Sequence, residues 1–249
     1  MDNDERLQAS LDRARVRLKN GIGTQSERLV HTMLKYYLEP DESAHEIKVG
    51  SRVADIFQKE TGHIYEIQTR GFERLRDKLK DFLEDYRVTV VYPVDSVKYL
   101  SWIDPETGEA TKRHKSPRKG MASDILPEIY KIPQVMNHPH LEFLVVLMEM
   151  EEYKLLSEKG KDWKNPKKGA VRMERLPLKV DGMVTISRKE DYLEMIPDSL
   201  PERFDRQQLM KALRLTGMKG SQAITVLERA GAILHVDTVD RKYIYQRDT

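Results

Sequence analysis

Residues 53–70, "VADIFQKETGHIYEIQTR", constrain the fold more than any other part of this chain. Two short runs of alternating apolar and polar residues flank the turn sequence "KETG", which predicts a hairpin of strands at 52–57 and 63–69. Side chains alternate along a strand, so Asp55 shares a face with Phe57, and Glu66 shares one with Gln68. A turn near 59–62 places Asp55 and Glu66 almost directly opposite each other. The hairpin therefore carries an opposed pair of acids.

Two like charges that face each other across a strand ladder destabilise the pairing. A divalent cation between Asp55 and Glu66 would relieve the repulsion, because Mg²⁺ and Mn²⁺ prefer hard oxygen ligands. The alternative is that one of the two strands lies at the edge of the sheet and both acids face water. The spacing alone leaves both interpretations open.

The elements around the hairpin predict an α/β fold with a mixed sheet flanked by helices. Apolar residues at helical spacing predict helices over residues 7–18, in "SERLVHTMLKYYL", and in "GFERLRDKLKDFLEDY". A further strand is expected at 45–49, and the apolar run "VTVVY" suits a strand that is covered on both faces. "LEFLVVLMEM" at 141–150 predicts another buried strand.

Composition narrows the class of protein. At 39% hydrophobic and 34% charged residues, the chain is expected to form a globular protein with an ionic surface. No apolar run is long enough for a transmembrane helix, and the charged N-terminal residues do not resemble a signal peptide, so we expect a cytoplasmic protein without a membrane partner. The absence of cysteine excludes disulfides and thiolate zinc sites.

The order of elements and the acidic pair together resemble the PD-(D/E)xK nuclease superfamily. The motif stands here as Asp55, ten intervening residues, and then Glu66–Ile67–Gln68. "GIGTQSERLVHTML" is similar to the N-terminal helix of archaeal Holliday-junction resolvases and Mrr-like restriction endonucleases. The resemblance covers residues 21–94 and implies a restriction-endonuclease-like core that acts as a metal-dependent DNA endonuclease. It also implies a Mg²⁺ or Mn²⁺ site formed by Asp55, Glu66 and the carbonyl of Ile67, with Glu27 binding directly or through water.

Two positions of the motif allow a second interpretation. "TQSE" at 24–27 is also a capping box, in which Glu27 would bond the amide of Thr24. Gln68 stands where the superfamily has lysine, and a neutral amide cannot act as a base. We therefore expect Gln68 to orient the attacking water and the cation to activate it. The alternative function is a catalytically inactive DNA-binding protein or regulator with the nuclease fold.

Basic residues outside the pair are candidates for phosphate contacts. Thr69 and Arg70 follow the second strand and could touch the scissile phosphate, or could simply start the next helix. The segment "KRHKSPRKG" is predicted to be a mobile basic loop, with a solvated surface loop as the alternative to DNA contact. Its candidate residues are Lys112, Arg113, Lys115, Arg118 and Lys119.

A second metal site is conceivable further along the chain. His138 and His140 in "NHPH" would combine with acids of "MEMEEY". The alternative is a proline turn followed by a solvated strand end. The acids concerned are Glu149, Glu151 and Glu152.

The tail resembles a winged helix-turn-helix. It reads as a helix in "DRQQLMKALRL", a tight turn "TGMKG", a helix in "SQAITVLERAG" and a hairpin with its tip at "VDRKY". Short polar residues at the start of a recognition helix suit base edges and phosphates, although such domains also bind proteins. The predicted DNA contacts are Lys219, Ser221, Gln222, Thr225 and Arg229 on the second helix, with Arg241 and Lys242 on the wing.

The chain is accordingly expected to contain three parts. Residues 1–155 would form the nuclease-like core with the basic insertion, residues 156–195 a linker or bridging segment that includes "KGKDWKNPKKG", and residues 196–249 the winged helix. A homodimer would supply the two active sites that double-strand cutting usually needs.

Overall fold

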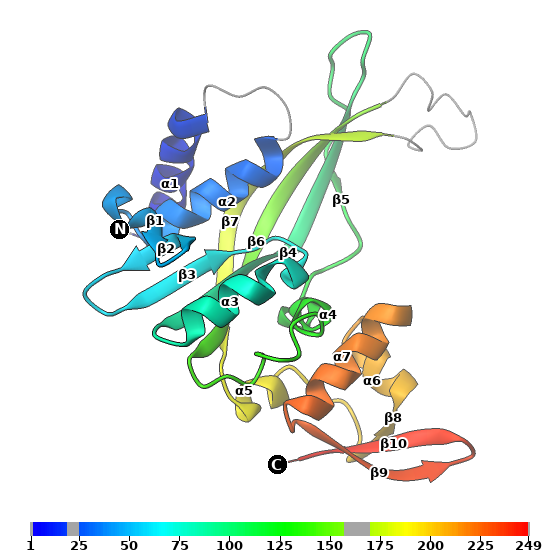
Figure 1. Ribbon diagram of the computed structural model, residues 1–249. Helices are drawn as coiled ribbons and strands as arrows, with labels where there is room; N and C mark the ends of the chain where they lie inside the picture. Colours follow the sequence, from blue (N-terminus) through cyan, green and yellow to red (C-terminus); the bar gives the residue numbers. More distant parts are fainter. Residues whose placement is uncertain (1, 19–24, 157–169, 249) are drawn as a thin grey trace. The chain divides into compact units, whose positions relative to one another are not determined.

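The computed structural model describes residues 2–18, 25–156 and 170–248; for residues 25–27 only the backbone is described. The chain is a mixed α/β protein with a large mixed sheet flanked by helices (Figure 1). The strand order in this sheet is β1-β2-β3-β4-β6-β7, and β5 pairs with β4. None of the described helices combines the length and apolar character needed to cross a membrane.

The chain forms two compact units that interleave along the sequence. The first unit comprises Met1–His45, Asp95–Gly120 and Val146–Gly182. The second unit comprises Glu46–Val94, Met121–Val145 and Met183–Thr249. Four strands, β1 (His45–Val49), β4 (Arg87–Ile103), β6 (Leu141–Leu155) and β7 (Val171–Ile186), contribute residues to both.

The first unit contains two helices that pack against each other, α1 (Asn3–Leu18) and α2 (Gln25–Leu38). Most apolar residues predicted for these helix faces are buried, among them Leu7 and Leu11 in α1 and Met33 and Leu34 in α2, whereas the last residue of each helix is half-buried. Acids occupy the first turn of α1 and arginines its last turn, which suits the helix dipole. A short 3₁₀ helix, η1 (Glu42–Ala44), leads out of this pair towards the sheet.

The predicted hairpin is present in the second unit. After β1 (His45–Val49), strands β2 (Arg52–Gln58) and β3 (His63–Ile67) pair antiparallel, with Ile56 opposite Tyr65 and Phe57 opposite Ile64. Strand β3 then pairs in parallel with β4. The second strand ends at Ile67, two residues earlier than the sequence predicts.

The helix after the hairpin starts in a way that local sequence does not show. Gly71 adopts a left-handed conformation (φ 74°), a 3₁₀ turn η2 (Phe72–Leu75) follows, and only then does α3 (Arg76–Leu83) begin. The carboxylate of Glu128 accepts hydrogen bonds from the amides of Gly71 (2.7 Å) and Phe72 (3.1 Å). A residue 57 positions away in sequence thus satisfies the orphan amides at this turn.

Two strands are longer than the sequence suggests. Strand β4 continues past "VTVVY" and through Pro93 to Ile103, and β6 extends to Leu155. Pro93 lies beyond Val91, the last β4 residue paired with β3, so its missing N–H costs no bond in that ladder. The segment predicted as a mobile basic loop is partly held on β4, because β5 (His114–Lys115) pairs with Tyr99 and Leu100.

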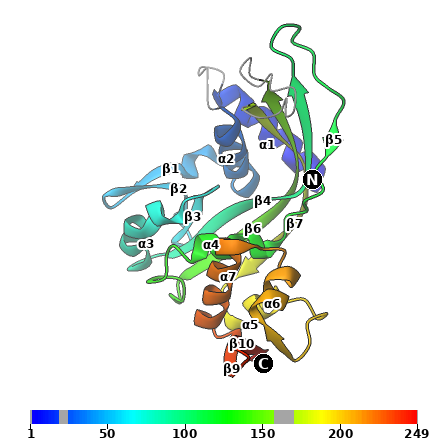
Figure 2. The same cartoon turned by 90° about the vertical axis from the view of Figure 1, so that its right-hand side faces the viewer.

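The predicted linker at 156–195 contains regular structure. Strand β7 (Val171–Ile186) and the short helix α5 (Lys189–Leu193) lie within it, while "KGKDWKNPKKG" falls outside the described residues. Strand β7 ends the strand order of the described sheet, and residues on both of its faces are exposed, so apolar alternation is weak. A short helix, α4 (Leu126–Ile129), precedes β6 and contacts α7 (Gly217–Arg229) of the tail; both views place the two helices side by side (Figures 1 and 2).

The tail contains the predicted helices and hairpin. Strand β8 (Arg203–Asp205) is followed by α6 (Arg206–Ala212), α7 (Gly217–Arg229), β9 (Ile233–Val239) and β10 (Lys242–Arg247). The three strands form an antiparallel sheet in the order β8-β10-β9. The tight turn expected at "TGMKG" is shorter than predicted, because α7 already begins at Gly217.

Close packing between α6 and α7 depends on Gly220. A Cβ at this position would lie 2.5 Å from Met210 Cε, 2.7 Å from Met210 Cγ and 3.1 Å from the carbonyl oxygen of Leu215. We expect Gly220→Ala to lower the free energy of unfolding by about 1–3 kcal/mol, because the backbone carbonyl cannot move away as a side chain can. Chemical denaturation measures this, with Gly182→Ala as the matched control, since nothing lies within 4 Å of a Cβ at Gly182. Equal stability of the two variants would contradict the packing argument.

Candidate functional site

Asp55 and Glu66 lie at the end of the β2–β3 hairpin that is away from its turn. The observed register, continued by one residue beyond Ile56 and Tyr65, places Asp55 opposite Glu66. Glu66 Oε1 accepts a hydrogen bond from the amide of Asp55 (3.2 Å), and Asp55 Oδ2 accepts one from the amide of Ile67 (2.9 Å). Each carboxylate therefore bonds the main chain of the opposite strand. These reciprocal bonds fix both side chains on one face of the hairpin.

Lys78 on α3 completes this group. Its Nζ lies 2.6 Å from Glu66 Oε2, and the Glu66 side chain is only 2% exposed. Helix α3 follows the hairpin and delivers Lys78 to the face that carries the acids. The site is thus two carboxylates and one ammonium group, drawn from β2, β3 and α3.

Burial and charge shift the acidity of Glu66. Burial, and after it the negative charge of Asp55, raises the pKa of Glu66 from 4.5 to about 7, while Lys78 and the Asp55 amide act in the opposite direction. A carboxyl group with this pKa can hold or release a proton near neutral pH. The same repulsion would be relieved by a cation bound beside the pair.

The candidate ligand atoms are oxygens, the type of ligand that a hard divalent cation prefers. Asp55 and Glu66 supply carboxylate oxygens, and the carbonyl of Ile67 is the third ligand that the motif implies. Among the side chains that the structure describes, no three histidines or acids gather closely enough to hold a metal ion. The Glu27 side chain and the Thr24 capping partner lie outside the described part of the chain, so that ligand stays a prediction.

Gln68 contacts the turn that follows β3. Its side-chain amide donates to the carbonyl of Arg70, and its backbone amide donates to the carbonyl of Val91 (2.9 Å). Thr69 is half-buried and Arg70 is exposed at the same turn. The positive charge beside Glu66 comes from Lys78 on α3, whereas Gln68 is a neutral amide that contacts the turn.

The basic residues at 112–119 belong to the first unit and are all exposed. The guanidinium of Arg113 lies over the ring of Tyr99 (3.6 Å to the centroid) and 3.5 Å from Glu151. Lys115 Nζ lies 5.8 Å from the same ring. These two side chains are therefore folded onto their own sheet, which leaves their role in binding DNA a prediction.

The residues considered from sequence as a second metal site form other contacts instead. His138 and His140 form a turn, with the amide of His140 donating to His138 Nδ1 (3.2 Å). Glu152 lies on β6, and its side chain is only 2% exposed. Its carboxylate is surrounded by Lys98 (3.2 Å), Arg172 (3.2 Å) and Lys154 (3.4 Å). Burial opposes the ionisation of Glu152, but these cations hold its pKa below the usual value.

The predicted DNA contacts of the tail differ in their surroundings. Lys219, Arg241 and Lys242 are exposed, whereas Ser221 and Thr225 are half-buried. Ser221 Oγ accepts from Arg206 (3.1 Å), and the Thr225 hydroxyl donates to the carbonyl of Ser221 (3.2 Å). Gln222 is half-buried, and Arg229 is exposed with its guanidinium 6.0 Å from the Tyr130 ring centroid.

Sequence reasoning missed Lys78 and Glu128. Lys78 follows Leu75 by three residues and precedes Phe82 by four, so it lies at the margin of the apolar face of α3. A lysine at the margin of an apolar helix face was the sequence feature that could have indicated a contact with a buried acid. Glu128 has no such signal, because its partners Gly71 and Phe72 are brought to it only by the fold.

Comparisons with known proteins place the chain in a family. The fold and site define a mixed α/β protein with an acidic pair whose Glu66 is buried, and residues 28–187 match the family described as "Domain of unknown function (DUF8091)". The chain belongs to this family. It is also 29% identical over 228 residues to an uncharacterized protein of Treponema pallidum (strain Nichols), a match that covers 91% of this chain and 88% of that protein. No solved structure matches the chain.

The raised pKa of Glu66 predicts a pH-dependent stability. Because the folded protein holds this proton more tightly than the unfolded chain, the contribution of Glu66 to the free energy of unfolding is present below pH 4.5 and lost as pH rises through about 7. We expect Glu66→Gln to remove this loss, on the order of 3 kcal/mol. Chemical denaturation of both proteins between pH 4.5 and 8 measures the difference. Parallel pH profiles would contradict the shift.

Proposed function

We propose that this protein is a Mg²⁺-dependent DNA endonuclease with a restriction-endonuclease-like core and a winged-helix domain that binds DNA. The observation that carries the proposal is the opposed pair of Asp55 and Glu66, which shares one face of the hairpin with Lys78. Hairpin β2–β3, helix α3 and the parallel strand β4 follow in the order that the nuclease motif requires. The acidic pair supplies the hard ligands and Lys78 supplies a fixed positive charge.

Each residue of the site has a proposed role in phosphodiester hydrolysis. Asp55, Glu66 and the Ile67 carbonyl would hold the cation, which when bound polarises a phosphate and lowers the pKa of water. Lys78 takes over the part of the missing motif lysine, because its ammonium group lies 2.6 Å from Glu66 and can stabilise charge that develops on the phosphoryl group. Gln68 would orient the attacking water only if its amide leaves the carbonyl of Arg70.

The tail supports the DNA-binding part of the proposal. The tail contains β8, α6, α7, β9 and β10 in that order, with the sheet order β8-β10-β9 and the short helix α5 before it. This order is the one expected of a winged helix and supports the proposal. Gln222, Thr225 and Arg229 lie on one strip of α7 at helical spacing, outside its buried face. That strip is the surface that would meet the DNA.

A catalytically inactive DNA-binding protein is the second candidate. It is favoured by the reciprocal bonds of the two carboxylates to the amides of Asp55 and Ile67, which give the acids a structural reason to be there. The two candidates differ in their response to divalent metal.

Asp55→Asn decides between them. The variant keeps the size of the side chain and removes one charge, so we expect it to lose both cleavage of DNA and any rise in melting temperature on adding Mg²⁺ or Mn²⁺. DNA affinity in EDTA should stay at or above that of the wild type, because a negative charge near the phosphates has gone. Wild-type protein that shows neither metal stabilisation nor cleavage of duplex, junction, flap or single-stranded DNA would instead establish the inactive candidate.

The role of Lys78 can be tested by removing its positive charge and then placing a lysine at position 68. We expect Lys78→Gln to lower the cleavage rate about a hundredfold, the scale of losing one charge-stabilising group. Adding Gln68→Lys to that variant should restore activity if the motif position can serve instead. Lys80→Gln, on an exposed position of the same helix, is the control and should cleave like the wild type. Full activity of Lys78→Gln would show that the lysine only neutralises Glu66.

A further inference from the structure

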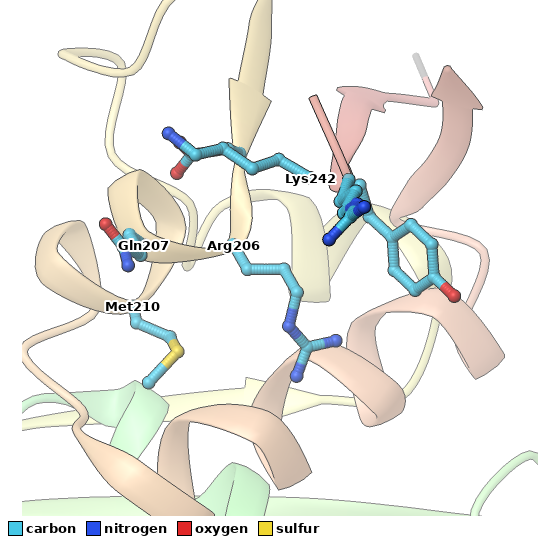
Figure 3. A pocket seen from close by; sticks show the side chains of 7 residues that line it. Arg206, Gln207, Met210 and Lys242 are labelled. Atoms are coloured by element: carbon cyan, nitrogen blue, oxygen red, sulfur yellow. The ribbon is translucent and has the colours of Figure 1, made fainter. Parts of the chain in front are cut away.

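The tail contains a groove between α6 and the tip of the β9–β10 hairpin. Its volume is about 420 Å³. Arg206, Gln207 and Met210 extend from α6 on one side, and Lys242 comes from the hairpin on the other (Figure 3). The full lining is Asp205, Arg206, Gln207, Met210, Arg241, Lys242 and Tyr243.

The groove is positively charged. In the part of the chain that the structure describes, none of Arg206, Arg241 and Lys242 forms an ion pair with a carboxylate. The acid of the lining, Asp205, caps α6, and its Oδ1 accepts from the amide of Gln208 (2.8 Å). Arg206 is held in place by its hydrogen bond to Ser221. The lining thus carries three cationic groups and one carboxylate, and that carboxylate already accepts a hydrogen bond. This balance of charge favours an anionic ligand.

The groove also offers an aromatic surface. Tyr243 is 51% exposed, and its ring is tilted against that of His235 with centroids 4.9 Å apart. Met210 adds a polarisable thioether to the same lining. Cations beside an exposed aromatic ring are the chemistry that binds an unpaired nucleotide, because the phosphates meet the charges and the base stacks on the ring.

We infer that this groove binds a single-stranded segment of DNA, with one unpaired base on Tyr243 and its flanking phosphates on Arg206, Arg241 and Lys242. The inference rests on the proposed function and names its substrate class, DNA with an unpaired strand. A base inside a duplex has both faces covered by its neighbours and cannot reach Tyr243 without leaving the stack. Duplex DNA would therefore use the cations of the groove without the ring.

The test measures binding of the full chain to a fluorescein-labelled oligothymidylate of about eight nucleotides, by anisotropy in EDTA. We expect Tyr243→Leu to weaken binding about tenfold and Tyr243→Phe to bind like the wild type, because stacking needs the ring and not the hydroxyl. Arg206→Gln should weaken binding and flatten the slope of log affinity against log salt by about 0.7, the value for one single-strand phosphate contact. Lys211→Gln is the control, because Lys211 is exposed on the same helix and outside the lining.

Three results would overturn the inference. Wild-type affinity of both Tyr243→Leu and Arg206→Gln would exclude the groove as the site, and an equal loss of duplex and single-strand binding in Tyr243→Leu would exclude stacking. Tighter binding of an oligouridylate of the same length would assign the groove to RNA. Because the assay contains no divalent metal, its outcome is independent of whether Asp55→Asn affects cleavage.

Discussion

The bonds between the two acids and the opposite strands join three elements of the second unit at one point. Glu66 accepts from the Asp55 amide, Asp55 accepts from the Ile67 amide, and Lys78 bonds the remaining oxygen of Glu66. Beyond the pair of Ile56 and Tyr65, these carboxylates replace the ladder bonds that the two strands would otherwise make. The end of the hairpin is therefore held by side chains, and helix α3 is joined to it by a partly buried ion pair.

Holding the two carboxylates side by side lowers the stability of the fold. A carboxylate with 2% exposure next to a second carboxylate loses hydration and gains repulsion, and one ammonium group offsets only part of both. Apolar residues at these positions would pack on the same face at no such cost. Strained electrostatics of this kind concentrate at catalytic and metal-binding sites, which is the physical ground for proposing one here. The charged groove of the tail follows the same logic, because among the described residues none of its three cations forms an ion pair with a carboxylate.

The long strands show why the boundaries of elements were harder to predict than their order. Strand β4 runs through Pro93 because the ladder with β3 has already ended at Val91, and nothing in the local sequence gives that position. Strand β7 has weak alternation because residues on both of its faces are exposed. Both cases follow from what packs beside and against each strand, a property of the whole fold.

Local pattern determined much of this protein by itself. The alternation around "KETG" and the helical spacing in α2 and α3 gave the hairpin, the helix order and the opposition of Asp55 and Glu66, because turn geometry fixes register over so short a span. Only the tertiary structure decided that Lys78 is the partner of Glu66, that Glu128 caps the turn at Gly71, and that Arg206 and Tyr243 line one groove. Those contacts join residues on separate elements, and their meeting depends on how the elements pack rather than on any periodicity in the chain.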